Sequence, residues 1–139
     1  MARGRRIAFD YGDVRTGVAL CDPDGILVSP LCVLQTQSKS FFEEVSSLIT
    51  EHDPIKIFVG QPLNMSGSSG ASAEKVGLFI ERLRSICDLP IDMVDERLST
   101  VSAQKKLKEA GVSTRAAKTL IDAMAAVAIL EQGLLSEEN

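Results

Sequence analysis

The fold is decided by residues 7–28, which read IAFDYGDVRTGVALCDPDGILV. Apolar runs at 7–9 and 17–21 predict two strands, and the run at 26–28 opens a third within the stretch that ends at about residue 34. The link between the last two runs is Asp22-Pro23-Asp24-Gly25, which is typical of a hairpin turn because Pro fixes φ and Gly tolerates a positive φ. We therefore expect the chain to open with an antiparallel meander.

Beyond this meander the apolar period changes, and helices alternate with strands. Ser40 and Glu43 match a capping box, and Pro54 is expected to end the helix that starts there. The further predicted elements are a strand over 55–59, a Gly- and Ser-rich loop over 60–72, a helix carrying 76–87, a strand over 91–94, a helix over about 100–110 and a last helix from 113 or 114 to about 135. This order predicts one α/β domain over residues 1–139, a mixed five-stranded sheet (three antiparallel strands, then parallel βα units) with helices on both faces. Such a topology is the ribonuclease H-like arrangement.

The composition is that of a globular protein outside a membrane. The chain has 139 residues, 45% of them hydrophobic and 24% charged. Its longest strongly apolar run, Ala123–Leu130, is far shorter than the ~20 residues that a membrane span needs. The N-terminus has no apolar signal region, so we expect a cytoplasmic protein. The three cysteines (Cys21, Cys32 and Cys87) are too few and too far apart for a disulfide framework or a zinc site, and we expect buried thiols.

Positive charge is concentrated in one segment of an acidic chain. The net charge is −4, yet residues 97–118 contain six basic residues and one acid, a net +5. A basic stretch on an acidic protein is typical of a phosphate-binding surface, and equally of a solvated helix. Both interpretations stay open on charge alone.

Carboxylates occur at three places where chemistry is plausible. Asp10 ends the first predicted strand, and Asp95-Glu96 follow the last one. Strand alternation directs Asp95 and Glu96 to opposite faces, so only one of the two can join Asp10. Asp122 is the single polar residue of the apolar run 120–130, where a carboxylate is costly unless it is paired or binds a metal. An ion pair with Lys118, a turn earlier, is the alternative for Asp122.

These acids suit a divalent metal better than a protein nucleophile. Mg²⁺ and Mn²⁺ prefer oxygen ligands and leave room for water and substrate phosphate, which supports hydrolysis of a phosphodiester bond. The single histidine, His52, falls at a predicted helix C-terminus, where the helix dipole explains it. Ser-His or Cys-His catalysis is therefore not expected.

Four motifs resemble the YqgF family, whose members are called pre-16S ribosomal RNA nucleases or Holliday junction resolvases. They are Asp10-Tyr11-Gly12 with Arg15-Thr16-Gly17-Val18-Ala19, then Gly60-Gln61-Pro62-Leu63-Asn64-Met65 with Gly67 and Gly70, then Asp95-Glu96-Arg97-Leu98-Ser99-Thr100, and finally Ile121-Asp122-Ala123 with Ala125-Ala126. They occur in the family's order and cover nearly the whole chain. The resemblance implies a ribonuclease H-like fold, a divalent-metal nuclease and a role in maturing the 5′ end of small-subunit ribosomal RNA.

The resemblance also implies a set of site residues. Asp10, Glu96 and Asp122 match the family's catalytic, metal-binding acids, and the expected cofactor is Mg²⁺ or Mn²⁺. Ser66 and Ala125 stand where the family or related resolvases carry a further acid, so whether one or two ions bind stays open. The expected substrate contacts are Arg15, Asn64, Arg97, Arg115 and Lys118, with Lys105, Lys106 and Lys108 as a secondary basic face. The sequence gives little support for aromatic stacking, because Tyr11 is the one aromatic near the site that we expect to be exposed and the five phenylalanines fall mostly on apolar stripes.

Several functions compete at this stage. The first is a metal-dependent nuclease acting on structured RNA (pre-rRNA), with branched DNA as the alternative substrate of a junction resolvase. The second is a nucleic-acid-binding factor in ribosome assembly or transcription that cleaves little or nothing, which the absent fourth acid favours. The third, a nucleotide-binding ATPase, would need a second domain and a second Asp-x-Gly loop. A homodimer is compatible with the apolar stripes.

Overall fold

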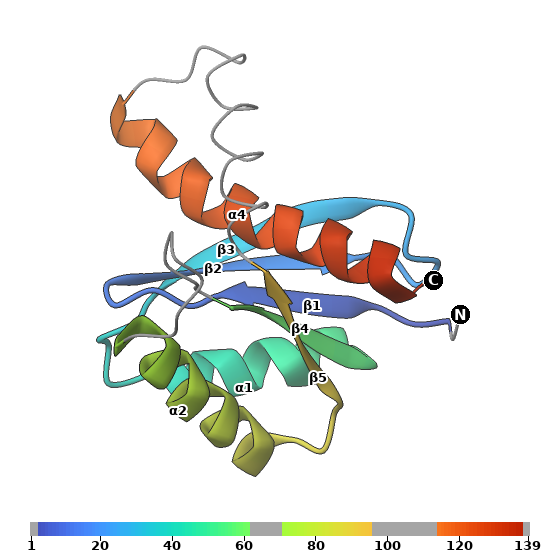
Figure 1. Ribbon diagram of the computed structural model, residues 1–139, viewed down its shortest axis with the longest axis horizontal. Helices are drawn as coiled ribbons and strands as arrows, with labels where there is room; N and C mark the ends of the chain where they lie inside the picture. The colour runs from blue at the N-terminus through green and yellow to red at the C-terminus, as the bar shows by residue number, and fades with distance from the viewer. Residues whose placement is uncertain (1–2, 62–70, 96–113, 138–139) are drawn as a thin grey trace.

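Figure 1 shows a computed structural model of the chain, in which residues 3–61, 71–95 and 114–137 are described. Side chains are described for residues 3–61, 73–95 and 123–137. The helix expected over 100–110 lies outside these ranges. In chain order the elements are β1 (Arg6–Asp10), β2 (Arg15–Cys21), β3 (Val28–Gln35), α1 (Phe41–His52), β4 (Lys56–Gln61), α2 (Ala71–Ile86), β5 (Ile91–Asp95) and α4 (Thr114–Glu137).

The strands form one five-stranded sheet in the order β3-β2-β1-β4-β5. β1 pairs with β2, and β2 with β3, in antiparallel fashion. β4 pairs with β1, and β5 with β4, in parallel. The mixed sheet predicted from the sequence is therefore confirmed, and the carboxyl ends of β1, β4 and β5 meet at one edge.

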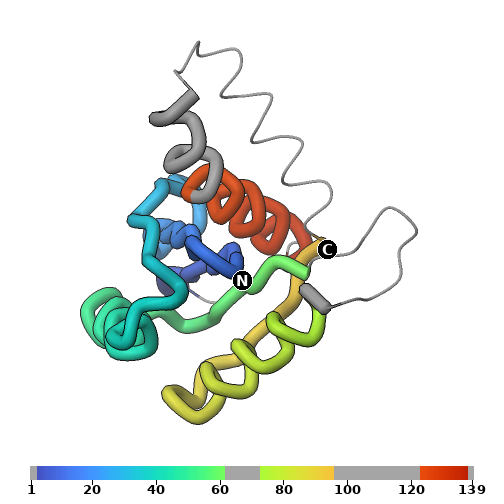
Figure 2. Tube along the Cα trace, turned by 90° about the vertical axis from the view of Figure 1, so that its left-hand side faces the viewer, coloured from blue at the N-terminus to red at the C-terminus, as the bar shows by residue number. Residues whose placement is uncertain are grey.

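Helices cover both faces of this sheet, as expected. Figures 1 and 2 show α1 and α2 together on one side of the strands and α4 on the other. Side chains alternate between the two faces along each strand. On β1, Phe9 packs in the cluster that holds α1 and α2, whereas Ala8 packs in the cluster that holds α4. We call these the α1/α2 face and the α4 face.

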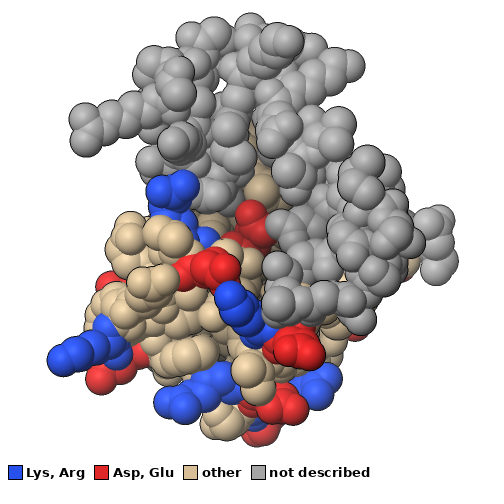
Figure 3. Space-filling view, turned by 60° about the vertical axis from the view of Figure 1, so that its left-hand side comes forward, with Lys and Arg blue, Asp and Glu red and all other residues tan. Residues whose placement is uncertain are grey.

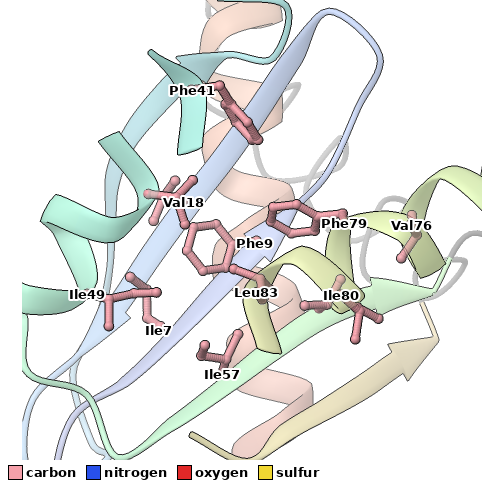
Figure 4. Close-up of a cluster of buried hydrophobic side chains, with 12 residues drawn as sticks. Ile7, Phe9, Val18, Phe41, Ile49, Ile57, Val76, Phe79, Ile80 and Leu83 are labelled. Atoms are coloured by element: carbon pink, nitrogen blue, oxygen red, sulfur yellow. The ribbon is translucent and has the colours of Figure 1, made fainter. Parts of the chain in front are cut away.

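Large side chains fill the α1/α2 face. Phe9, Phe41 and Phe79 are buried there, and Phe9 meets Phe79 edge to face with ring centroids 5.7 Å apart. Branched aliphatic residues from α1, α2 and the strands surround these rings, as Figure 4 shows. Burying each such side chain stabilises the fold by about 1.5–3 kcal/mol, so this face supplies much of the core.

Small side chains line the α4 face. Ala8 and Ala19 of the strands and Ala126 of α4 are completely buried. Where α4 crosses β4, Gly133 touches the Phe58 ring so closely that a Cβ on the glycine would lie 2.6 Å from the ring. The helix therefore lies close against the strands on this face.

Buried charges fix the C-terminal end of α4. Glu137 pairs with Arg6 at 3.2 Å and with Lys56 at 3.1 Å, and Lys56 also pairs with Asp92 at 2.6 Å. The Arg6 side chain is only 2% exposed, so its charge depends on these partners. Glu137 thus ties the end of α4 to the amino ends of β1 and β4.

One strand begins later than the sequence predicts. The hairpin turn forms, with Gly25 at φ 70° and its N–H donating to the Asp22 carbonyl at 3.0 Å. The third strand, Val28–Gln35, however, starts at Val28 and not at Ile26. The Asp22 carboxylate accepts the backbone N–H of Ile26 at 2.7 Å and of Leu27 at 3.3 Å, which extends the turn and leaves both apolar side chains exposed.

The capping box expected at the start of α1 does not form. Ser40 is the N-cap residue, yet its side chain makes no capping hydrogen bond, and its φ of −93° and ψ of 9° are outside the usual cap geometry. Its hydroxyl instead lies 3.0 Å from the hydroxyl of Ser38. The helix ends as predicted, at His52, followed by Asp53 in the left-handed conformation and then Pro54.

Candidate active site

The site begins with a row of residues that crosses the sheet at its carboxyl edge. Asp10, partly buried at the end of β1, is paired with Gly17 of β2. On the other side of β1, Phe9 is paired with Val59 of β4, so the next residue along β4, Gly60, lies beside Asp10. Gly60 is in turn paired with Val94 of β5. Glycine has no side chain, so neither neighbouring strand places one beside the Asp10 carboxylate at these positions. Small neighbours of this kind are compatible with a metal ligand at Asp10, which needs room for the ion and its other oxygen ligands.

The alternation of β1 assigns Asp10 to the α4 face. Ala8, two residues earlier, packs against α4, and residues two apart in a strand point the same way. Arg15 lies two residues before Gly17 on β2 and so belongs to the same face. Of the expected site residues whose side chains are described, Asp10 and Arg15 therefore lie on the same face at the same edge of the sheet.

The short loop between β1 and β2 sets the distance between these two residues. A Cβ on Gly12 would lie 2.5 Å from the carbonyl oxygen of Arg15, so only glycine fits at this position. The backbone N–H of Thr36 donates to the Val14 carbonyl at 2.9 Å and joins the loop to the end of β3. This explains physically why a glycine follows the Asp-Tyr pair.

Asp95, the last residue of β5, lies on the face of the sheet opposite to that of Asp10. Val94 packs in the α4 cluster, whereas Asp95, the next residue, belongs to the α1/α2 face. Asp95 therefore does not share the face of Asp10, in line with the expectation that only one of the pair can. Glu96 and Arg97 lie outside the described residues, as does Asn64 in the 60–72 segment.

Asp122 belongs to α4, which runs from the carboxyl edge of the sheet towards its amino edge. This direction follows from Glu137, which contacts Arg6 and Lys56 at the amino ends of their strands. Asp122 precedes Ala126 by one helical turn, and Ala126 is fully buried in the α4 cluster. The side chains of Arg115, Lys118 and Asp122 lie outside those described, so their roles stay predictions.

A metal site is neither assembled nor contradicted by the residues described. Among them, no three His, Cys, Asp or Glu side chains are grouped closely enough to hold an ion. Two of the three expected ligands, Glu96 and Asp122, are not among those side chains. The Asp10 carboxylate is a hard oxygen donor with glycines on both flanks, which fits Mg²⁺ or Mn²⁺.

Protein nucleophiles are poorly placed for catalysis. His52 lies at the end of α1, close to Ile55, whose N–H donates to Arg5 at the amino edge of the sheet. It is thus at the opposite end from Asp10. Burial raises the pKa of the Cys21 thiol, and burial raises that of Cys32 as well, so both thiols stay protonated. A thiolate is the reactive form of cysteine, so a raised pKa disfavours these two thiols as nucleophiles.

Sequence reasoning missed a groove next to this site. A hollow of about 300 Å³ lies between the β1–β2 loop, the start of α1 and α2. It is lined by Tyr11, Phe42, Lys75, Leu78, Phe79 and Arg82. The helical spacing of Lys75, Leu78 and Arg82 was a readable signal for one solvent-facing stripe on α2. Which rings from other elements face that stripe could not be read from the sequence.

Comparison with known proteins gives concordant matches. Residues 4–136 match the RuvX family, described as Holliday junction resolvase. A Streptomyces coelicolor protein named "Putative pre-16S rRNA nuclease" is 42% identical over 99% of this chain and 83% of its own length. A Rhodococcus jostii protein of the same name is 41% identical over 99% of this chain and 80% of its own.

One solved structure matches in fold. The RuvC of T. thermophilus, in complex with a Holliday junction substrate, superposes with a TM-score of 0.61 at 14% identity, covering 97% of this chain and 96% of that one. This likeness confirms the ribonuclease H-like fold that the order of strands predicted. Within the described ranges, no helix is long and apolar enough to span a bilayer.

Proposed function

Because the chain belongs to the RuvX (YqgF) family, we propose that it is a divalent-metal-dependent nuclease that hydrolyses phosphodiester bonds. Its proposed substrate is the 5′ extension of the precursor of 16S ribosomal RNA, because the names of its relatives give this precursor as their substrate. Residues 1–139 act in this proposal as one nuclease domain in the cytoplasm.

The observation that carries the proposal is the row Gly17–Asp10–Gly60. It places one carboxylate on the α4 face, at the edge where parallel strands end, with glycines at the adjacent positions of both neighbouring strands. Neighbours without side chains suit a metal ligand, which needs room for the ion, water and a substrate oxygen.

Glu96 and Asp122 complete the proposed metal-binding set. Alternation along β5 directs Asp95 away from the face of Asp10, which favours Glu96 as the acid supplied by that strand. Asp122 comes one turn before Ala126 on a helix that packs against the same face. Asp10 would then be the central ligand, and Glu96 and Asp122 the flanking ones.

The residues around the site would hold the nucleic acid in place. Mg²⁺ or Mn²⁺, when bound, supplies Lewis-acid activation of water and stabilisation of the departing oxygen. Arg15, on the face of Asp10, is suited to pair with a phosphate oxygen of the substrate. Asn64, Arg97, Arg115 and Lys118 are proposed as further contacts. The +5 charge of residues 97–118 would attract the polyanion towards this edge.

The experiment compares the wild type with Asp10→Asn on two substrates. A 5′-extended ribosomal RNA precursor fragment and a four-way DNA junction are incubated with Mg²⁺, Mn²⁺ or EDTA. We expect cleavage of the RNA that requires metal and is abolished in Asp10→Asn, while RNA binding is retained. Preferential cutting of the junction would reassign the substrate. Binding without cutting by the wild type would favour the alternative, a binding factor in ribosome assembly or transcription.

A further inference from the structure

We propose that the groove beside α2 binds one nucleotide of single-stranded nucleic acid next to the cleaved bond. This inference rests on the proposed function, because it supplies a second contact for the same substrate. The groove is lined by rings on its floor (Tyr11, Phe42 and Phe79) and by Lys75, Leu78 and Arg82 of α2. Its volume of about 300 Å³ is at the lower end of small-molecule pockets, a size suited to a single nucleotide.

The floor of the groove is aromatic and rigid. Tyr11 stacks on Phe79 with ring centroids 4.7 Å apart and the ring planes inclined by 23°. Phe41, buried beneath, meets Tyr11 at 6.2 Å and Phe42 at 5.0 Å. Rings held by such contacts offer a fixed apolar surface to a base without a large loss of side-chain entropy. Stacking of this kind is tolerant of base identity.

Two cations stand at the rim, and both are available for exchange of partners. The Arg82 guanidinium carbon lies over the Phe42 ring, 4.9 Å from its centroid, and a guanidinium can itself stack on a base. Lys75 pairs with Asp13 at 3.0 Å, with both side chains more than half exposed. Exposed pairs of this kind contribute little stability, so a substrate phosphate can replace Asp13 as the partner of Lys75.

The groove lies at the same edge of the sheet as the candidate active site. Tyr11 directly follows Asp10, and the two belong to opposite faces of the sheet. A strand of nucleic acid that crosses the carboxyl edge would therefore meet the Asp10 carboxylate on one side and the groove on the other. Consecutive Cα atoms are ~3.8 Å apart, which is short enough for one or two nucleotides to reach both places.

The described residues on the side shown in Figure 3 form no broad positive patch. In Figure 3, Lys and Arg side chains lie interspersed with Asp and Glu over the described part of this side. An exposed leucine, Leu78, 66% exposed, stands between Lys75 and Arg82 along the helix. Cations separated by an apolar side chain suit one nucleotide, whose phosphate would pair with a cation at the rim while its base lies in the groove.

The test measures binding of a short single-stranded RNA by fluorescence anisotropy, at several salt concentrations. The double variant Lys75→Gln/Arg82→Gln is compared with the matched control Arg84→Gln, an exposed cation of α2 that does not line the groove. We expect the double variant to bind about tenfold more weakly, with its salt slope reduced by about 0.7 for each phosphate that is no longer neutralised. Arg84→Gln should stay within about twofold of wild type. Equal weakening in both variants, or in neither, would overturn the proposal.

A second measurement does not depend on mutation. RNA carrying thiouridine is crosslinked by light to the unmodified protein, and the attachment sites are mapped by mass spectrometry. Crosslinks to Tyr11 or Phe42 support the groove, and crosslinks confined to other surfaces contradict it. If the wild type fails to cleave but crosslinks at Tyr11, the groove stands and the nuclease fails. If the wild type cleaves but the double variant binds RNA as tightly as the wild type, the nuclease stands and the groove fails.

Discussion

The two faces of the sheet are built from side chains of different size, although they share the same five strands. The α1/α2 face is filled by Phe9, Phe41 and Phe79 with branched aliphatic residues around them. The α4 face is lined by Ala8, Ala19 and the alanines of α4, and its only large aromatic is Phe58 among the described residues. One face therefore supplies apolar burial, and the other brings a helix close to the strands.

This difference explains where the candidate site lies. A carboxylate side chain is short, so acids from a strand and from a helix can share an ion only where helix and strand approach closely. Small residues allow that approach on the α4 face, and Asp10 belongs to it. On the other face, large rings leave a groove at the edge that suits a base better than an ion.

The largest expected effect is on cleavage, and it distinguishes Glu96 from its neighbour in the sequence, Asp95. Glu96→Gln should reduce metal-dependent cleavage at least a thousandfold, about 4 kcal/mol of transition-state stabilisation, because it would remove a ligand from the α4 face. The matched variant Asp95→Asn, on the opposite face, should stay within about threefold of wild type. Single-turnover cleavage rates measure both. A severe loss in Asp95→Asn with normal Glu96→Gln would reverse the assignment of faces.

On the α1/α2 face, removal of an aromatic ring should lower the free energy of unfolding considerably. Phe79→Ala is expected to cost about 3–5 kcal/mol, because Phe79 is 2% exposed and contacts Phe9 and Tyr11. Its exposed neighbour provides the control, since Leu78→Ala should change the free energy of unfolding by less than about 0.5 kcal/mol. Urea denaturation gives both values. Similar losses in the two variants would contradict the packing described for α2.

Two glycine substitutions, one in α4 and one in α2, test how closely α4 approaches the sheet. Gly133→Ala places a Cβ 2.6 Å from the buried Phe58 ring and should destabilise the fold by about 1–2 kcal/mol. Gly77→Ala in α2 meets nothing within 4 Å and should stabilise it by about 0.5–1 kcal/mol, from helix propensity alone. Thermal melting of the two variants compares them directly. Stabilisation by Gly133→Ala would mean that α4 lies farther from the sheet than described.

The smallest effect concerns the charges at the end of α4. Burial acts to lower the pKa of Lys56, but the carboxylates of Asp92 and Glu137 outweigh it and the pKa is raised. A raised pKa means that Lys56 contributes stability fully below its unfolded value of about 10.4, and that this contribution is lost as the pH rises through the folded value. Wild type should thus lose up to about 1 kcal/mol more than Lys56→Met between pH 9 and pH 12. Parallel declines in the two proteins would refute this ion-pair contribution.

Much of the fold could be predicted because its signals are local. Turn residues Asp22 to Gly25, the proline after α1 and the alternation of β1 each act within a few positions. The prediction failed where a side chain outcompeted propensity, as when the Asp22 carboxylate captured the N–H groups of Ile26 and Leu27 and delayed β3. The pairing of Arg6 with Glu137 spans nearly the whole chain and has no local signal.

The candidate site was predictable in part, for the same reason. The positions of Asp10 and Asp95 at strand ends follow from strand periodicity and agree with the observed pairing. The separation of Asp95 from Glu96 stays a prediction, because Glu96 lies outside the described residues. The groove depends on Tyr11, Phe42 and Arg82, which come from three elements. Their meeting is set by the packing of α1 and α2, which sequence spacing does not specify. A homodimer and the number of bound ions stay predictions.

The most direct test of the account is cleavage of the 5′-extended ribosomal RNA precursor by wild type and by Asp10→Asn, with Mg²⁺, Mn²⁺ or EDTA. Binding of the same RNA and the melting temperature of each protein are measured in parallel. The account predicts metal-dependent cutting by the wild type only, with equal binding and similar stability in the variant. Undiminished cutting by a folded Asp10→Asn protein would contradict the claim that this carboxylate is the centre of the site.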